Sequence, residues 1–326
     1  QILLADITKV FMVSGSEGYA CGKNGLLLKT IDGCNTWTAL RVNSTLDIKD
    51  VYFELGQPDG FLLFSDNTLK QYNETSQDFT AIAETSVTAM KFFSSSHGVI
   101  SIGDELKEFD GTIFSTIYSG STSETMLSLD FKENSGNIIG YAAGTNANLW
   151  YWDGATTTMT GPTQLYSTSN SFTKVGCYFP GSGSTVKPVI LEDNGELYSY
   201  DPTGATLTNT KSSIQDFCFL NATDGYAVTP SGIVYKTVDS GQNWPTTASS
   251  VSVPTSTIRT LAIRTAGSFV IAIGIGDDKK IYQNFLTGGG WAEGSRFVPL
   301  GLNDISDLES GTNDEMFCTV GDNGTV

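Results

Sequence analysis

The feature that most constrains the fold of this chain is an internal repeat. Residues 18–37 read GYACGKNGLLLKTIDGCNTW, residues 225–244 read GYAVTPSGIVYKTVDSGQNW, and the two stretches align without a gap. Each predicts an apolar strand, a glycine-containing turn, a second strand, and an aspartate-containing turn that ends on tryptophan. Glycine in the first turn supplies the positive φ angle that a tight hairpin requires. The repeat therefore predicts a protein built from a series of similar antiparallel hairpins.

Weaker copies of the first hairpin turn fill the rest of the chain and set a period. The turns fall near Gly25, Asn67, Asp104, Asn148, Asn194, Gly232, Asp278 and Asn323. From Gly25 to Gly324 the eight turns span 299 residues, so the seven intervals average about 43 residues. A period of about 40–45 residues with several short strands per repeat is typical of β-propeller blades. Helical repeats are excluded, because no stretch shows sustained 3.6-residue periodicity.

The sequence thus predicts an all-β protein, a single β-propeller domain over residues 1–326 with blades of four antiparallel strands. In the first blade, the strands are expected at residues 7–13, 18–22, 26–29 and 37–41. The blades are expected to begin near residues 6, 46, 85, 124, 170, 213, 257 and 304. This spacing favours eight blades over seven.

The last repeat is incomplete, so closure of the ring needs a further strand. Residues 305–308 and 316–320 predict two strands, and a third only begins before Val326. Because an open ring leaves strand edges that promote aggregation, we expect residues 1–5 (QILLA) to complete the eighth blade. If they complete the blade of a neighbouring chain instead, the same pairing produces a fibre. In a third account, the natural protein is longer and this sequence ends within a blade.

The second turn of each strong repeat carries the most specific motif, S/T-x-D-x-G-x-T-W. The first copy contains Thr30, Asp32 and Trp37, with Cys34 in place of the glycine. The second copy contains Thr237, Asp239, Gly241 and Trp244, with Asn243 in place of the threonine. The aspartate can accept hydrogen bonds from backbone amides of its own turn, and the tryptophan can pack back into the blade. These residues are expected to be structural, and no catalytic residue is assigned.

With the preceding G-Y-A pattern, these units resemble the repeats of Asp-box (BNR-type) β-propellers. The nearest resemblance is to the Ycf48-like group, which contains photosystem II assembly and stability factors. It covers the two stretches closely and implies the fold more than the function, since propellers host many functions. Sialidases share the Asp-box more distantly and would require three arginines around a carboxylate. Such a triad is not expected, because the chain has no Arg-Ile-Pro signature and its arginines are Arg41, Arg259, Arg264 and Arg296.

The composition excludes several classes of function. With 18 basic and 35 acidic residues, a net charge of −17, the chain has no basic surplus for nucleic acid or anionic lipid. The single histidine, His97, is expected in an exposed loop, and no G-x-S-x-G motif indicates a catalytic triad. The acidic turns lack EF-hand spacing and the cysteines lack C-x-x-C spacing. Neither a metal site nor a cofactor is predicted.

Several features favour a secreted protein in an extracellular, lumenal or periplasmic compartment. Four Asn-x-Ser/Thr sequons are candidate glycosylation sites, at Asn43, Asn73, Asn221 and Asn323. The chain begins at Gln1 and not at Met, as after removal of a signal peptide. No apolar stretch approaches the ~18–20 residues of a membrane-spanning helix. The five cysteines, an odd number, leave at least one free or paired between chains.

Two hypotheses about function come from different classes of protein. In the first, a non-enzymatic secreted propeller binds a protein partner, assembles with itself or builds an extracellular structure. In the alternative, a carbohydrate-active enzyme or glycan-binding propeller carries paired carboxylates in its central channel. The two differ in whether two acidic side chains converge near the axis. Trp150 and Trp152 alternate on one strand, and we expect them to pack between blades and not to form a sugar-binding platform.

Overall fold

The computed structural model describes the chain as a series of antiparallel β-strands. The described residues are 7–14, 17–31, 38–120, 123–134, 137–153, 158–165, 169–178, 186–221, 223–249, 257–266, 269–276, 281–286, 291–293, 302–306 and 318–321. Within them, the helical elements are two short 3₁₀ turns, η1 (Lys23–Gly25) and η2 (Thr145–Ala147). The all-β prediction is therefore confirmed.

The described strands form seven four-stranded sheets and one two-stranded sheet, each with its strands in chain order. The first four sheets contain β1 (Ile7–Met12), β2 (Gly18–Gly22), β3 (Leu27–Thr30), β4 (Thr38–Leu40), β5 (Ile48–Phe53), β6 (Asp59–Phe64), β7 (Leu69–Asn73), β8 (Asp78–Glu84), β9 (Ala89–Ser94), β10 (His97–Ile102), β11 (Glu105–Phe109), β12 (Phe114–Ser119), β13 (Met126–Asn134), β14 (Asn137–Gly144), β15 (Asn148–Asp153) and β16 (Thr158–Gln164). The next three contain β17 (Phe172–Tyr178), β18 (Lys187–Glu192), β19 (Leu197–Asp201), β20 (Thr206–Lys211), β21 (Asp216–Phe219), β22 (Gly225–Val228), β23 (Val234–Thr237), β24 (Thr246–Ser249), β25 (Ile258–Ala266), β26 (Phe269–Gly276), β27 (Ile281–Phe285) and β28 (Trp291–Glu293). The two-stranded sheet pairs β29 (Leu302–Ser306) with β30 (Cys318–Gly321).

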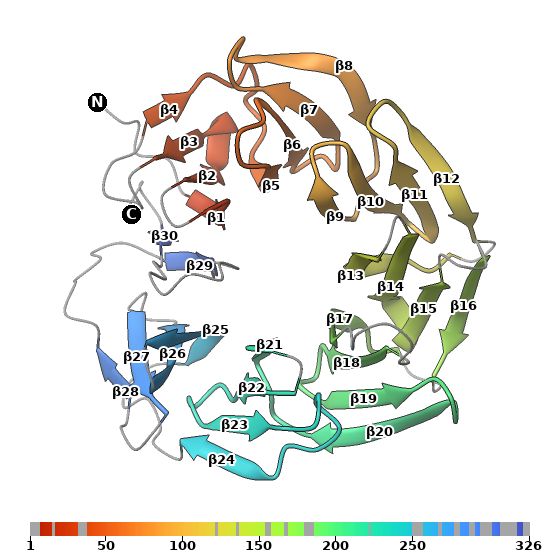
Figure 1. Ribbon diagram of the computed structural model, residues 1–326, viewed down its shortest axis with the longest axis vertical. Helices are drawn as coiled ribbons and strands as arrows, with labels where there is room; N and C mark the ends of the chain where they lie inside the picture. The colour runs from red at the N-terminus through yellow and green to blue at the C-terminus, as the bar shows by residue number, and fades with distance from the viewer. Residues whose placement is uncertain are drawn as a thin grey trace.

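The sheets stand around a common centre (Figure 1). The first strand of each sheet lies innermost, and the fourth strand of each four-stranded sheet lies at the rim. Neighbouring inner strands are in contact: β1 with β5, β9 with β13, β13 with β17, and β21 with β25. The two-stranded sheet lies between the first and seventh sheets, because β29 contacts both β1 and β25. Residues 1–5 and Val326, on which the predicted closure depends, lie outside the described residues.

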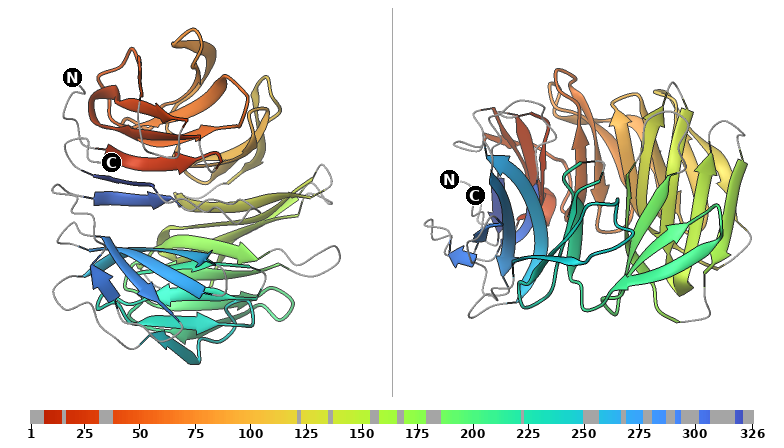
Figure 2. Two further views of the ribbon diagram at one scale, coloured as in Figure 1. Left: turned by 60° about the vertical axis from the view of Figure 1, so that its left-hand side comes forward. Right: turned by 60° about the horizontal axis from the view of Figure 1, so that its bottom comes forward.

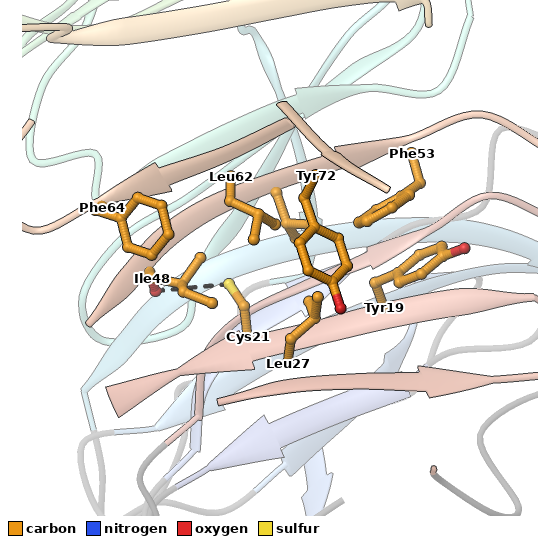
Figure 3. Packing of buried hydrophobic residues seen from close by; sticks show 9 residues of the cluster. Tyr19, Cys21, Leu27, Ile48, Phe53, Leu62, Phe64 and Tyr72 are labelled. Atoms are coloured by element: carbon orange, nitrogen blue, oxygen red, sulfur yellow. Dashed lines mark hydrogen bonds between the residues drawn. The ribbon is translucent and has the colours of Figure 1, made fainter. Parts of the chain in front are cut away.

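Neighbouring sheets pack face to face (Figure 2), and the hydrophobic core lies between them. At the contact between the first two sheets, Tyr19 of β2 stacks on Phe53 of β5 with ring centroids 3.8 Å apart (Figure 3). Further buried side chains from both sheets surround this pair: Cys21, Leu27, Ile48, Val51, Leu62, Phe64 and Tyr72. Burying one such large side chain contributes about 1.5–3 kcal/mol. Side-chain packing is therefore a major force that holds adjacent sheets together.

The first hairpin turns of the two strong repeats have the predicted backbone conformation. Gly25 has a φ of +71° and Gly232 a φ of +88°, both in the left-handed region. At Gly25 there is a second constraint, because a Cβ atom would lie 2.3 Å from the carbonyl oxygen of Ser44. Glycine is therefore needed there for conformation and for space.

Candidate functional site

The predicted Asp-box turn of the sixth sheet connects β23 to β24, and polar side chains hold it closed. The Thr237 hydroxyl donates to Asp239 Oδ1 (2.7 Å) and accepts the backbone N–H of Gly241 (3.0 Å). Asp239 also accepts the backbone N–H (3.0 Å) and the side-chain amide (2.8 Å) of Asn243. Burial alone would raise the pKa of the Asp239 carboxyl, but the hydrogen bonds from Asn243 and Thr237 keep that pKa below its usual value. Asp239 is therefore a carboxylate fixed within its own turn.

Gly241 and Trp244 pack this turn against the neighbouring strands. Gly241 has a φ of +82°, and a Cβ atom there would lie 2.3 Å from Cγ2 of Val189. Trp244 is 3% exposed and belongs to the same buried cluster as Val189 of the fifth sheet. Its ring lies 6.4 Å from that of Phe219, centroid to centroid. The turn thus contributes to the core between the fifth and sixth sheets.

The first copy of the box is described only in part. Thr30 ends β3 and is 1% exposed, whereas Asp32 and Trp37 lie outside the described residues. The residue between the threonine and the aspartate is exposed in both copies: Ile31 by 72% and Val238 by 57%. The sequence pattern did not identify these two side chains, although both copies carry a β-branched residue at that position.

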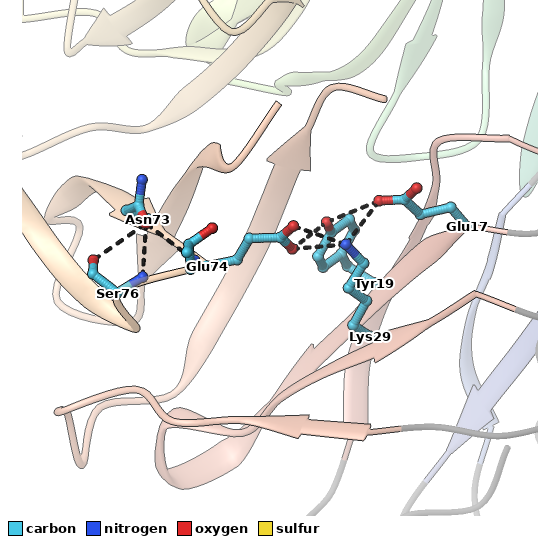
Figure 4. A network of polar contacts seen from close by, with 7 residues as sticks. Glu17, Tyr19, Lys29, Asn73, Glu74 and Ser76 are labelled. Carbon is cyan, nitrogen blue, oxygen red and sulfur yellow. Dashed lines mark hydrogen bonds and ion pairs between the residues drawn. The ribbon is translucent and has the colours of Figure 1, made fainter. Parts of the chain in front are cut away.

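A charged network links the first and second sheets (Figure 4). Lys29 Nζ on β3 lies 2.9 Å from Glu17 and 2.8 Å from Glu74, which lies in the turn between β7 and β8. The Tyr19 hydroxyl donates to Glu74 Oε2 at 2.7 Å, and the centre of its ring lies 5.3 Å from Lys29 Nζ. Burial, followed by the hydrogen bond to Glu74, raises the pKa of Tyr19 far above its usual range. With two carboxylates to one ammonium, the network keeps a net negative charge.

The sixth sheet repeats the core of this network. Lys236 Nζ lies 2.6 Å from Asp224 and 5.6 Å from the centre of the Tyr226 ring. The hydrogen bond to Asp224 raises the pKa of Lys236 despite its partial burial. The acid-Gly-Tyr pattern and the later lysine of each strong repeat therefore encode a contact between an acid, a tyrosine and a lysine.

Acidic side chains on the inner strands bind the backbone of the next sheet. An innermost strand is hydrogen-bonded on one edge, so the N–H groups on its other edge need partners. Asp130 of β13 accepts the backbone N–H of Cys177 on β17 at 2.7 Å. The same carboxylate lies 3.3 Å from Lys91 Nζ on β9. One aspartate thus joins the third, fourth and fifth sheets.

Asp216 repeats this arrangement two sheets further on. It accepts the backbone N–H of Leu261 on β25 at 2.9 Å and lies 2.6 Å from Lys174 Nζ on β17. Each of these two inner-strand carboxylates therefore has a backbone donor and a lysine as partners.

One end of the blades carries most of the exposed large hydrophobic side chains, whereas each end has six acidic residues in its described connections. Because the strands of each sheet are antiparallel and in chain order, the first-to-second and third-to-fourth connections leave at the same end. Within the described residues, these connections contain no Lys or Arg and six acidic residues: Glu17, Glu54, Glu74, Asp110, Asp224 and Asp239. Four of the five exposed large hydrophobic side chains in the described part also lie there: Ile31, Leu55, Ile113 and Val238. We call these connections together the acidic turn face.

The remaining aromatic and histidine predictions have different outcomes. Trp150 and Trp152 of β15 are 0% and 4% exposed and pack in a cluster between sheets, which confirms that they are core residues. His97 is not the exposed loop residue expected from the three serines before it. It begins β10, is half-buried, and its Nε2 lies 2.8 Å from Glu108. The turn before β10 is shorter than the polar run suggests, so the strand already includes the histidine.

The sequons lie in different surroundings. Asn43 and Asn221 are exposed in connecting segments. Asn73 ends β7 and is half-buried, and its side-chain amide donates to Asp59 at 2.9 Å. Asn323 lies outside the described residues.

In the part of the chain that the structure describes, no group of three His, Cys, Asp or Glu side chains is arranged to hold a metal ion. No helix of that part is long and apolar enough to cross a membrane.

Solved structures match this chain, whereas no protein-family model and no curated protein does. Sqt1 of Saccharomyces cerevisiae is similar with 11% identity and a TM-score of 0.73, over 99% of this chain and 95% of that one. The Dos1 propeller has 9% identity and a TM-score of 0.67, over 100% of this chain and 94% of that one. YCF48 bound to a D1 peptide has 15% identity and a TM-score of 0.59, over 88% of this chain and 94% of that one.

These similarities define the class: the chain has a β-propeller fold. YCF48 from Cyanidioschyzon merolae is a further similar structure, with 15% identity and a TM-score of 0.55 over 84% of this chain and 94% of that one. The resemblance to the Ycf48-like group in the repeats thus has a counterpart in three dimensions. At these identities, the similarity establishes the fold and not the function.

Proposed function

We propose that this chain is a non-enzymatic protein-interaction propeller whose acidic turn face binds a basic, partly apolar segment of a partner protein. The observation that carries the proposal is the composition of that face, with four exposed hydrophobic side chains and six acidic residues in its described connections. Glu17, Glu74 and Asp224 are paired with lysines of neighbouring strands, and the other three acidic residues have no lysine or arginine partner within the described part of the chain. Complementary charge speeds encounter and selects partners, and the apolar side chains add contact area. The neighbours support an interaction role, since YCF48 is bound to a D1 peptide.

The proposal includes an eight-bladed ring of the Asp-box type. Seven four-stranded sheets and one two-stranded sheet support the number of blades. The contacts of β29 with β1 and β25 support the position of the last blade. Residues 1–5 then supply a further strand of that blade from the same chain, because an intramolecular partner has a high effective concentration. Exchange of this strand between chains, which gives self-assembly, is the alternative.

We also propose that the protein is secreted and carries glycans at Asn43 and Asn221. Both side chains are exposed in connecting segments, as a glycan requires. Asn73 is a poorer acceptor because its amide is engaged with Asp59. Intact-mass measurement of protein from its native source, before and after enzymatic deglycosylation, tests this proposal. An unchanged mass would contradict it.

Fluorescence anisotropy with three labelled peptides tests the proposed function. The peptides share their apolar residues and differ in being lysine-rich, neutral or glutamate-rich. We expect the lysine-rich peptide to bind about tenfold or more tightly than the other two. Asp110→Lys on the acidic turn face should remove this preference, and Asp66→Lys, in the exposed turn between β6 and β7 at the opposite end, should keep it. Equal binding of the three peptides, or binding of none, would contradict the proposal.

A further inference from the structure

We propose that β12, the outer strand of the third sheet, is a docking strand to which an extended segment of the partner adds as a further strand. This inference rests on the proposed function and locates its binding site. Within the described residues, β12 is hydrogen-bonded to β11 on one side only, and it lies at the rim (Figure 1). Such an edge offers N–H and C=O groups to another strand unless something blocks it.

The other outer strands of the four-stranded sheets carry features that protect an edge. Three of them are short: β4 has three residues, β24 four and β28 three. β8 begins with Asp78 and ends with Glu84. β16 contains Pro162, and β20 ends with Lys211. A register shift interrupts the pairing between the third and fourth strands in the sheets that end on β8, β12, β16 and β20. This feature therefore does not distinguish β12.

β12 lacks all of these other protections. It reads FSTIYS, six residues with no charge, no proline and no glycine, and β-branched and aromatic residues of this kind favour strand pairing. Ser115 and Thr116 are exposed, whereas Phe114 and Ile117 are half-buried and pack against hydrophobic clusters between sheets. The strand is therefore held in place by its apolar side chains while part of it stays accessible.

The charges around β12 identify its occupant as a peptide with basic ends. Asp110 lies exposed in the turn before the strand, and Asp104 lies beside its far end, where its carbonyl oxygen accepts the N–H of Gly120 at 3.3 Å. Ile113, 57% exposed, connects this edge to the acidic turn face. Uncharged β-branched residues flanked by Lys or Arg fit this pattern. A second copy of this chain also has a net charge of −17, so the two copies would repel each other. A basic partner peptide therefore fits this edge better than a homodimer does.

The first test uses a fluorescein-labelled peptide, KKTVTVTVKK, titrated into the full chain by anisotropy. Ser115→Lys places a repelling charge on an exposed position of β12 and should weaken binding by about tenfold or more. Thr208→Lys makes the same change on an exposed position of β20 and should leave binding unchanged. Thermal unfolding of both variants verifies that they remain folded.

The second test asks whether the peptide pairs as a strand. N-methylation of alternate residues along one edge of the peptide removes the donors that face β12, and methylation of the other alternate residues leaves them. Strand addition predicts that one methylated peptide loses about tenfold or more in affinity and the other keeps its affinity.

The possible results separate this inference from the proposed function. If the two methylated peptides bind alike, or if Ser115→Lys binds as the unchanged protein does, the docking strand is wrong although basic peptides still bind. If no lysine-rich peptide binds, the proposed function fails as well. A dimer in sedimentation velocity that Ser115→Lys dissociates would assign the edge to a second copy and overturn the peptide occupant.

Discussion

At the residue scale, Trp244 determines how well the sixth-sheet turn is held in the core. Its ring is 3% exposed, so Trp244→Ala leaves a large cavity and should lower the free energy of unfolding by about 3–5 kcal/mol. Val238→Ala is a control in the same turn, because Val238 is 57% exposed and its truncation should change stability by about 0.5 kcal/mol or less. Urea denaturation measures both. A loss below about 1 kcal/mol for Trp244→Ala would contradict the packing described here.

Asp239 gives a residue-scale prediction about pH. Its hydrogen bonds hold the carboxyl pKa below its usual value, so the charged form stabilises the folded protein above the pKa of the unfolded chain, about 4. That contribution is lost as the pH falls through the lower pKa of the folded state. The stability difference between the unchanged protein and Asp239→Asn should therefore be constant from neutral pH down to about 5 and shrink below about 4. Urea denaturation of both proteins at a series of pH values measures this difference. If it is the same below about pH 4 as at neutral pH, the role assigned to the carboxylate is contradicted.

At the element scale, Lys29 and Lys236 offer a matched comparison between two sheets. Lys29 lies between two carboxylates from different sheets, whereas Lys236 is paired with Asp224 of its own sheet. Lys29→Met leaves the carboxylates of Glu17 and Glu74 without the ammonium between them. This should lower the free energy of unfolding by about 1–3 kcal/mol. Lys236→Met should cost less, since one carboxylate loses its partner. Equal losses in urea denaturation at neutral pH would show that the extra carboxylate does not contribute to the contact between sheets.

The strands of the first sheet could be predicted to within a residue at each end, because a glycine turn and alternating apolar residues fix a hairpin locally. The partner of Tyr19 could not. Its hydroxyl donates to Glu74, which is 55 residues away in the chain. The spacing of residues in the sequence does not indicate which turn of the next sheet lies beside Tyr19. The exposure of Ile31 and the uncharged edge of β12 were missed for a related reason. Both depend on which parts of a sheet lie at the rim and which lie between sheets.

At the scale of the whole molecule, deletion of residues 1–5 tests how the proposed ring closes. If the strand belongs to its own chain, the shortened protein should remain a monomer and unfold at a lower temperature, because the last blade loses a strand. If the strand is exchanged, the shortened monomer should be as stable as before and should no longer polymerise. Sedimentation velocity and thermal unfolding measure the two properties together. A deletion that alters neither would rule out both forms of closure.

Hydrogen–deuterium exchange tests whether a basic partner binds the acidic turn face, as proposed. Exchange is measured on the full chain with and without a saturating lysine-rich peptide. We expect slower exchange in the connections at residues 54–58, 74–77 and 110–113 and along β12, with no change at residues 65–68 and 193–196 at the opposite end. Protection confined to those opposite connections, or no protection anywhere while the peptide is bound, would contradict the proposal.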